Sequence, residues 1–149
     1  MQESLQSHAD QKADQSPSAK PVLNSGLPSI GLGVYHSGIE VYGREISFGW
    51  SDMGRTGVFE IQPRCASSVM PKVTYKKTVV VGTAFVSRAD VDVLLSKLVM
   101  EYPGSCYDVM DRNCNHFSND LSKRLCKKKI PSYVNRCVSS IHACLLENV

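Results

Sequence analysis

Apolar and polar residues alternate through the segment GVYHSGIEVYG at residues 33–43, which has Ser37 and Gly38 at its centre. This alternation predicts two short strands joined by a tight turn at Ser37-Gly38. Three further segments have the same strand-like texture: REISFGW (44–50), GVFEIQP (57–63) and YKKTVVVGTAFV (75–86). We expect a loop over residues 49–57, and Pro63 should end the strand that follows this loop.

After Ser87, the spacing of the apolar residues changes from that of a strand to that of a helix. Ser87 and Asp90 form a capping box of the Ser-x-x-Asp type, which is typical of a helix start. Five apolar residues then follow at helical spacing: Val91, Leu94, Leu95, Leu98 and Val99. The Pro103-Gly104 pair predicts the end of this first helix.

A second helix is predicted over about residues 113–127, with an apolar face made of Phe117, Leu121 and Leu125. The apolar spacing after Pro131 predicts the beginning of a last helix there. Strands therefore come first along the chain and helices follow them. This order predicts an α+β architecture, in which a small antiparallel sheet is packed with helices.

The first twenty residues differ in composition from the rest of the chain. They are rich in Gln, Ser, Asp and Lys and contain no aromatic residue. Such a segment buries too little apolar surface to offset its ordering entropy, so residues 1–20 are predicted to be a disordered tail. The 149 residues of the chain suffice for one domain. We expect it over residues 21–141, with residues 142–149 as a C-terminal end.

Composition and charge mainly exclude classes of function. The net charge of +3 is too small to indicate a nucleic-acid partner, and the basic residues concentrate in one run at 123–129. No stretch approaches the run of about 18 apolar residues that a membrane span needs. No signal peptide is visible either. We therefore expect no integral membrane segment, six reduced cysteines, and a location in the cytoplasm, with or without the nucleus.

The segment RNCNHFSNDL at residues 112–121 places Cys114 at the start of the second predicted helix. Unsatisfied N–H groups and the positive end of the helix dipole favour the thiolate there, and the thiolate is the reactive form of cysteine. A catalytic thiol also needs a base. The same residues are compatible with a cysteine that only packs in the core.

Four histidines are available as that base. His8 lies in the predicted tail, His142 lies near the C-terminus, and His116 is too close along the helix to face Cys114. This leaves His36 in the first strand segment. A strand-borne histidine facing a helix-start cysteine is the papain type of arrangement, here in reversed chain order. From the residues alone, a structural role for His36 as a hydrogen-bonded strand residue stays open.

Three segments resemble one family: GLGVYHSGIEVYGREISFG (31–49), NCNHFSNDL (113–121) and KKIPSYVNR (128–136). They are similar to the PPPDE superfamily, the permuted papain-fold peptidases of eukaryotes, and most of all to the DeSI type of desumoylating isopeptidase. The similarity covers about residues 29–136, and the motifs occur in the family's order. The resemblance implies a permuted papain-like cysteine peptidase fold in which His36 and Cys114 form the catalytic dyad.

The resemblance also implies a reaction and a partner. Cys114 would attack the isopeptide carbonyl of a conjugate with SUMO or ubiquitin, and His36 would act as the base. The backbone N–H of Cys114 is the first expected oxyanion donor. Asn113 and Asn115 are further candidates, although an asparagine at a helix start more often caps the helix. We expect no cofactor and no metal, and the resemblance leaves a homodimer open.

The chain departs from the family pattern before the first motif. Members of the family usually open with a strand of the type V-x-L-N-V-Y-D-L and a short linker. Here PVLN, at residues 21–24, is followed directly by SGLPSIGLG. This spacing predicts that most of the opening strand is missing, which would expose a sheet edge and reduce stability and activity.

Three alternatives stay open. The same dyad suits thioester substrates, and lecithin:retinol acyltransferase-like and NlpC/P60-type lipid-acting proteins carry a similar Asn-Cys-x-His-Phe motif. A truncated relative could instead bind a modifier without turning it over. The third alternative, a zinc site at Cys114-x-His116 and His142-x-Cys144, lacks the short Cys-x-x-Cys spacing of structural zinc sites.

Overall fold

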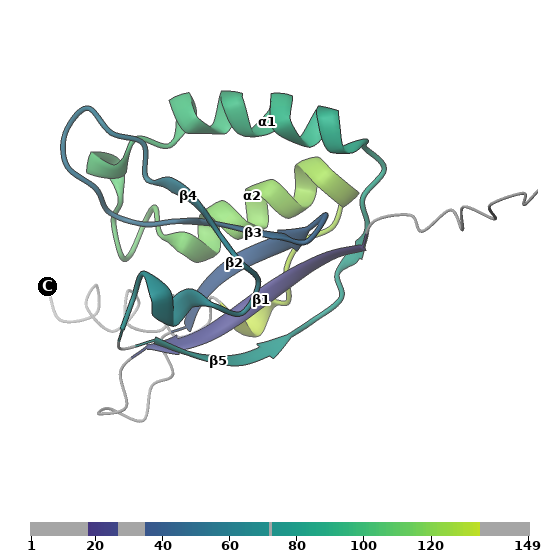
Figure 1. The fold of residues 1–149 in the computed structure, drawn as a ribbon, viewed down its shortest axis with the longest axis horizontal. Helices are drawn as coiled ribbons and strands as arrows, with labels where there is room; N and C mark the ends of the chain where they lie inside the picture. Colours follow the sequence, from purple (N-terminus) through teal and green to yellow (C-terminus); the bar gives the residue numbers. More distant parts are fainter. Residues whose placement is uncertain (1–17, 27–34, 72, 135–149) are drawn as a thin grey trace, which may run out of the picture.

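In the computed structural model of this chain, residues 18–26, 35–71 and 73–134 are described (Figure 1). The strands are β1 (Ser18–Gly26), β2 (Tyr35–Val41), β3 (Arg44–Phe48), β4 (Val58–Ile61), β5 (Val73–Thr78) and β6 (Gly82–Thr83). The helices are α1 (Arg88–Glu101) and α2 (Cys114–Cys126), with 3-10 turns at Ala66–Ser68, Gly104–Cys106 and Ser132–Val134. The predicted order of strands before helices is confirmed.

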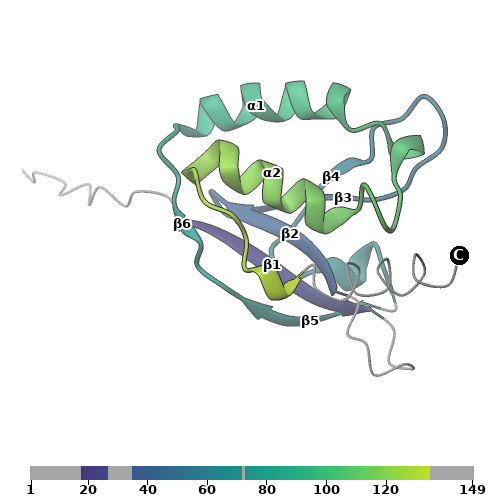
Figure 2. The same cartoon turned by 180° about the vertical axis from the view of Figure 1, so that it is seen from behind.

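The strands form one antiparallel sheet in the order β4-β3-β2-β1-β5, and β6 pairs with the beginning of β1. Helix α2 packs across β1, β2 and β3. Helix α1 lies beside α2 on the same side of the sheet in both views (Figures 1 and 2). The predicted α+β fold, a small antiparallel sheet packed with helices, is confirmed.

The core lies between the sheet and α2, and aromatic rings occupy its centre. Phe48 of β3 contacts the ring of Phe117 at 5.8 Å between centroids and meets Tyr102 edge-on at 5.1 Å. The predicted apolar face of α2 is confirmed, because Phe117, Leu121 and Leu125 are all fully buried. Burial of each such side chain stabilises the fold by roughly 1.5–3 kcal/mol.

The prediction of a turn at Ser37-Gly38 is wrong, because both residues lie inside the continuous strand β2. The chain turns instead at Tyr42-Gly43, where φ is +52° and +72°. Positive φ at both central residues suits the right-handed twist of a two-residue hairpin. Gly38 is small for another reason, since a Cβ there would lie 2.9 Å from Cγ of Glu45 on β3.

The prediction that most of the opening strand is missing is also wrong. Strand β1 is nine residues long and lies between β2 and β5. It begins at Ser18, so the last three residues of the predicted tail 1–20 belong to the sheet. Residues 1–17 and the predicted C-terminal end 142–149 lie outside the described residues, as does most of the helix predicted after Pro131.

Helix α1 begins where the sequence predicts, with the reciprocal Ser87–Asp90 capping box. Its predicted apolar face is only partly covered, since Val91 and Leu98 are buried while Val99 is 37% exposed. Within the described part of the chain, neither helix has the length and apolar character needed to cross a bilayer.

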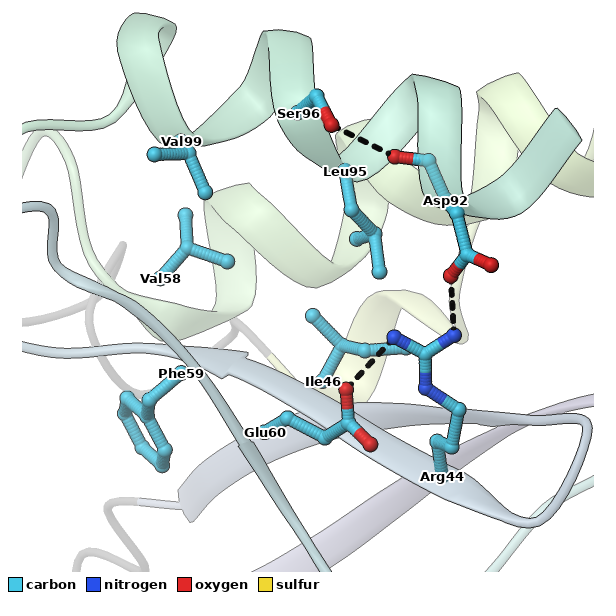
Figure 3. A pocket seen from close by; sticks show the side chains of 9 residues that line it. All are labelled: Arg44, Ile46, Val58, Phe59, Glu60, Asp92, Leu95, Ser96 and Val99. Carbon is cyan, nitrogen blue, oxygen red and sulfur yellow. Dashed lines mark hydrogen bonds and ion pairs between the residues drawn. The ribbon is translucent and has the colours of Figure 1, made fainter. Parts of the chain in front are cut away.

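A groove of about 350 Å³ separates α1 from the sheet edge at β4 (Figure 3). Arg44, at the start of β3, closes one end of it by pairing with Glu60 of β4 at 2.7 Å and with Asp92 of α1. Val58, Leu95 and Val99 supply apolar walls. The described residues that line this groove include neither cysteine nor histidine.

Candidate active site

Helix α2 begins with a capping box that fixes the backbone around Cys114. The Asn113 side-chain oxygen accepts hydrogen bonds from the backbone N–H groups of Asn115 at 2.9 Å and His116 at 3.1 Å. In return, the Asn113 backbone N–H donates to Nδ1 of His116 at 3.3 Å. Asn113 is thus the N-cap, and Cys114 is the first helical residue, as the sequence predicts.

The Cys114 side chain is 4% exposed and faces strand β2. Its Sγ lies 3.8 Å from the carbonyl oxygen of Tyr35, the residue that precedes His36. Next along β2, the Ser37 hydroxyl lies 3.4 Å from the carbonyl oxygen of Cys114 and 2.7 Å from Oδ1 of Asn115. Strand and helix therefore meet at the two segments that carry the predicted dyad.

The environment of Cys114 raises the pKa of its thiol, chiefly because burial disfavours the charged thiolate. Hydrogen bonds from Ser37 and Tyr107, among others, lower the same pKa but do not overcome burial. The sequence-based expectation that the helix start would favour the thiolate is therefore outweighed in this structure. At neutral pH the resting side chain is a thiol.

His36 is held by strand β3 and by a ring stacked alongside it. Its Nε2 lies 2.8 Å from the hydroxyl of Ser47, and its ring stacks on Phe59 of β4 with a centroid separation of 6.2 Å. Burial lowers the pKa of His36 from 6.5 to about 4. The imidazole is therefore neutral at pH 7, with one nitrogen protonated and the other able to accept a proton.

A pocket of about 430 Å³ opens beside His36. Its lining residues are His36, Gly49, Trp50, Phe59, Glu60, Val69, Met70 and Tyr107. Tyr107 connects this pocket to Cys114, because its side chain is hydrogen-bonded to that residue. Trp50, one of these lining residues, is 69% exposed and presents a large apolar surface to solvent.

The other predicted site residues have structural partners in this arrangement. The Asn113 side-chain amide donates to the carbonyl oxygen of Val109 at 2.7 Å, and that of Asn115 donates to Val134 at 3.4 Å. These bonds join Asn113 to the segment before α2 and Asn115 to the 3-10 turn at Ser132–Val134. The hydrogen bond of the His36 ring goes to Ser47 rather than to Cys114.

Sequence reasoning missed three residues that contact the predicted pair: Ser37, Ser47 and Tyr107. The sequence contained a signal for Ser47, because strand alternation on β3 places its side chain on the face opposite to Ile46 and Phe48. A polar residue on that face of a central strand needs a hydrogen-bond partner. Tyr107 had none, since it lies in the irregular segment between the helices.

Comparison with known proteins agrees with the motifs and the fold. The family model described as "PPPDE putative peptidase domain" matches residues 10–147. A desumoylating isopeptidase 1 homolog of Caenorhabditis elegans is 39% identical over 114 residues, which is 76% of this chain and 34% of that protein. A DeSI-like protein of Arabidopsis thaliana is 35% identical over 126 residues, which is 83% of this chain and 54% of that protein.

A DeSI-like protein of Schizosaccharomyces pombe is 35% identical over 109 residues, which is 72% of this chain and 53% of that protein. The chain thus spans between about a third and a half of the length of these curated relatives, from 34% to 54%. The resemblance inferred from the sequence motifs is confirmed. The chain belongs to the PPPDE peptidase family.

Proposed function

We propose that this protein is a cysteine isopeptidase, in which Cys114 is the nucleophile and His36 is the base. The observation that carries this proposal is the contact between Cys114 Sγ and the backbone of Tyr35, at 3.8 Å. It sets the sulfur against the strand that bears the imidazole. The sulfur also lies beside a pocket that is lined by His36 and by Tyr107, and the Tyr107 side chain is hydrogen-bonded to Cys114.

The proposed substrates are conjugates of ubiquitin-like modifiers. The relative in Caenorhabditis elegans is named as a homolog of a desumoylating isopeptidase, which supports this substrate class. The exposed Trp50 and Val69, which line the pocket, offer apolar contact area to a folded modifier or its extended tail. Aromatic side chains of this kind are enriched where proteins bind other proteins.

The resting state shapes the proposed mechanism. Because burial raises the pKa of Cys114 and lowers that of His36, the pair rests as neutral thiol and neutral imidazole. The proton therefore moves from Sγ to His36 as the sulfur attacks the isopeptide carbonyl carbon. The tetrahedral adduct then expels the lysine amine, which takes the proton from His36. Water hydrolyses the resulting thioester, and the modifier leaves with a free carboxylate.

The oxyanion of the adduct needs donors that are already oriented when it forms. The backbone N–H of Cys114 points from the first turn of α2, where no helical carbonyl accepts it. This first turn carries no acidic side chain that would compete for the positive end of the dipole. We therefore propose this N–H as the first oxyanion donor.

A modifier with a C-terminal electrophile tests the proposal, because it reacts only where a thiol is correctly placed. We expect it to label Cys114, and a lysine-linked modifier conjugate to be cleaved. Cys114→Ser and His36→Ala should each lower turnover by roughly three orders of magnitude or more. Cys106→Ser, which changes an exposed thiol outside the pocket, serves as the matched control.

Undiminished cleavage by either dyad variant with its fold intact would remove that residue from the mechanism. An S-acyl peptide run in parallel separates the substrate classes. Cleavage of the thioester alone would keep the dyad and overturn the isopeptidase assignment. Capture of the modifier without labelling or cleavage would instead indicate a binding protein.

A further inference from the structure

The side chain of Ser47 on β3 links the predicted base, His36, to the backbone of the neighbouring strand β2. Its hydroxyl oxygen lies 2.8 Å from Nε2 of His36 and 2.8 Å from the carbonyl oxygen of Ser37. The residue is fully buried, at 0% exposure, so water does not compete for these bonds. Both contacts are within ordinary hydrogen-bond distance.

Only one arrangement of protons satisfies both contacts. A serine hydroxyl has a single proton to donate, and a backbone carbonyl can only accept. The Ser47 proton therefore goes to the Ser37 carbonyl, and the Ser47 oxygen is left as an acceptor for His36. Nε2 must then carry a proton.

We propose that Ser47 is the positioning residue of the dyad, and that it holds His36 in the tautomer with the proton on Nε2 and the lone pair on Nδ1. This inference rests on the proposed function only for the catalytic role of the Nδ1 lone pair, which is to accept the proton of Cys114. The assignment of the tautomer itself depends on the hydrogen bonds alone.

Two further observations support this assignment. The lowered pKa of His36, about 4, leaves only one ring nitrogen protonated at pH 7, so the proton on Nε2 excludes one on Nδ1. The stacked ring of Phe59, inclined by 13° to the imidazole, restricts rotation of the His36 ring. The ring plane and the tautomer are thus fixed by different neighbours.

The consequence for catalysis concerns the proton that leaves Cys114. With its lone pair on Nδ1, His36 accepts that proton on Nδ1 and becomes an imidazolium with both nitrogens protonated. Ser47 keeps its bond to Nε2–H throughout, so it stabilises the cation without rearrangement. When Nδ1 passes the proton to the departing amine, the ring returns to the starting tautomer.

The experiment combines ¹⁵N NMR of histidine side chains with kinetics on the full chain. His36→Gln assigns the His36 signals, and the wild-type ring should show its proton on Nε2 at neutral pH. In Ser47→Ala we expect a mixture of the two neutral tautomers. Turnover kcat should fall about tenfold with KM little changed, because the substrate contacts remain while the base is misoriented.

Two variants separate positioning from packing. Ser47→Thr keeps the hydroxyl and should restore both the tautomer and most of kcat. Ser122→Ala is the matched control, because Ser122 is equally buried and its hydroxyl donates to the carbonyl of Lys128 at 2.8 Å. It should lose comparable stability and leave the His36 signals and kcat unchanged.

A proton found on Nδ1 in the wild type would overturn the proposal. So would an unchanged tautomer and kcat in Ser47→Ala. The expected tautomer in a chain whose turnover does not need Cys114 would preserve the positioning of His36 and overturn the proposed function. The two failures are therefore distinguishable.

Discussion

Helices α1 and α2 begin with the same capping-box geometry but in opposite surroundings. In α1 the Ser87 hydroxyl accepts from the Asp90 N–H at 3.2 Å, and the Asp90 carboxylate accepts from the Ser87 N–H at 3.0 Å. In α2, Asn113 and His116 make the corresponding reciprocal bonds. Ser87 and Asp90 at the start of α1 are exposed, whereas Asn113 at the start of α2 is buried, with 3% of its surface exposed.

The third residue of each helix makes the chemical difference. Asp90 places a carboxylate at the positive end of α1, and its hydrogen bonds with Ser87 lower the pKa of that carboxyl group. His116 occupies the same position in α2, and no acidic residue lies in that turn. One helix start thus has its positive end neutralised by its own side chain, while the positive end of the other has no acidic side chain in its first turn.

The largest effect that would test this difference is the pH dependence of Cys114 alkylation. Burial holds the pKa of this thiol above its ordinary value, so the thiolate is the minor form at neutral pH. Below its pKa the thiolate fraction rises tenfold per pH unit, so we expect a rise of about tenfold in rate between pH 7 and pH 8. Mass spectrometry of iodoacetamide-treated protein measures this rate at Cys114. A rate already at its plateau at pH 7 would mean that the helix start outweighs burial.

An exchange of the third residues would test the contrast directly. His116→Glu keeps a capping box and adds to α2 the kind of charge that Asp90 gives α1. We expect turnover of a modifier conjugate to fall about tenfold, because the carboxylate opposes the oxyanion, while the stability of the helix is kept. Asp90→His on α1 is the reciprocal control and should leave turnover unchanged. Equal turnover in His116→Glu would show that the charge of this turn has no part in catalysis.

The smallest expected effect concerns the exposed box alone. Ser87→Ala removes the side-chain acceptor at the start of α1 and should lower the free energy of unfolding by about 1 kcal/mol. Urea denaturation measures this change, and turnover of the native protein should stay the same. A loss of turnover without loss of stability would contradict a purely structural role for this helix start.

Local patterns predicted the elements that depend on nearest neighbours in the chain. Both helix starts are visible in sequence, because the Ser87–Asp90 capping box of α1 and the N-cap asparagine of α2 depend on residues at most three apart. The buried face of α2 is likewise visible, since Phe117, Leu121 and Leu125 repeat at the helical period. These features need no knowledge of the rest of the fold.

Interactions between distant residues were not predictable in the same way. The conformational freedom of glycine made Gly38 a signal for a turn. In the structure, a side chain is excluded at Gly38 because the side chain of Glu45 on the next strand occupies the space. The ionisation of Cys114 was misjudged for a similar reason. The effect of the helix dipole on Cys114 follows from its position at the start of α2, but its burial follows from the packing of α2 against strand β2.

The absence of a Cβ at Gly38 also limits which substitutions the β2–β3 strand pair can accept. Gly38 lies opposite Ser47 in the sheet and two residues from His36. Even a methyl group there would approach the backbone oxygen of Ile46 to 3.1 Å, so β2 and β3 would have to separate where the His36–Ser47 bond crosses between them. This position therefore limits which sequences can preserve the spacing of the two strands, although it contributes no atom to the chemistry.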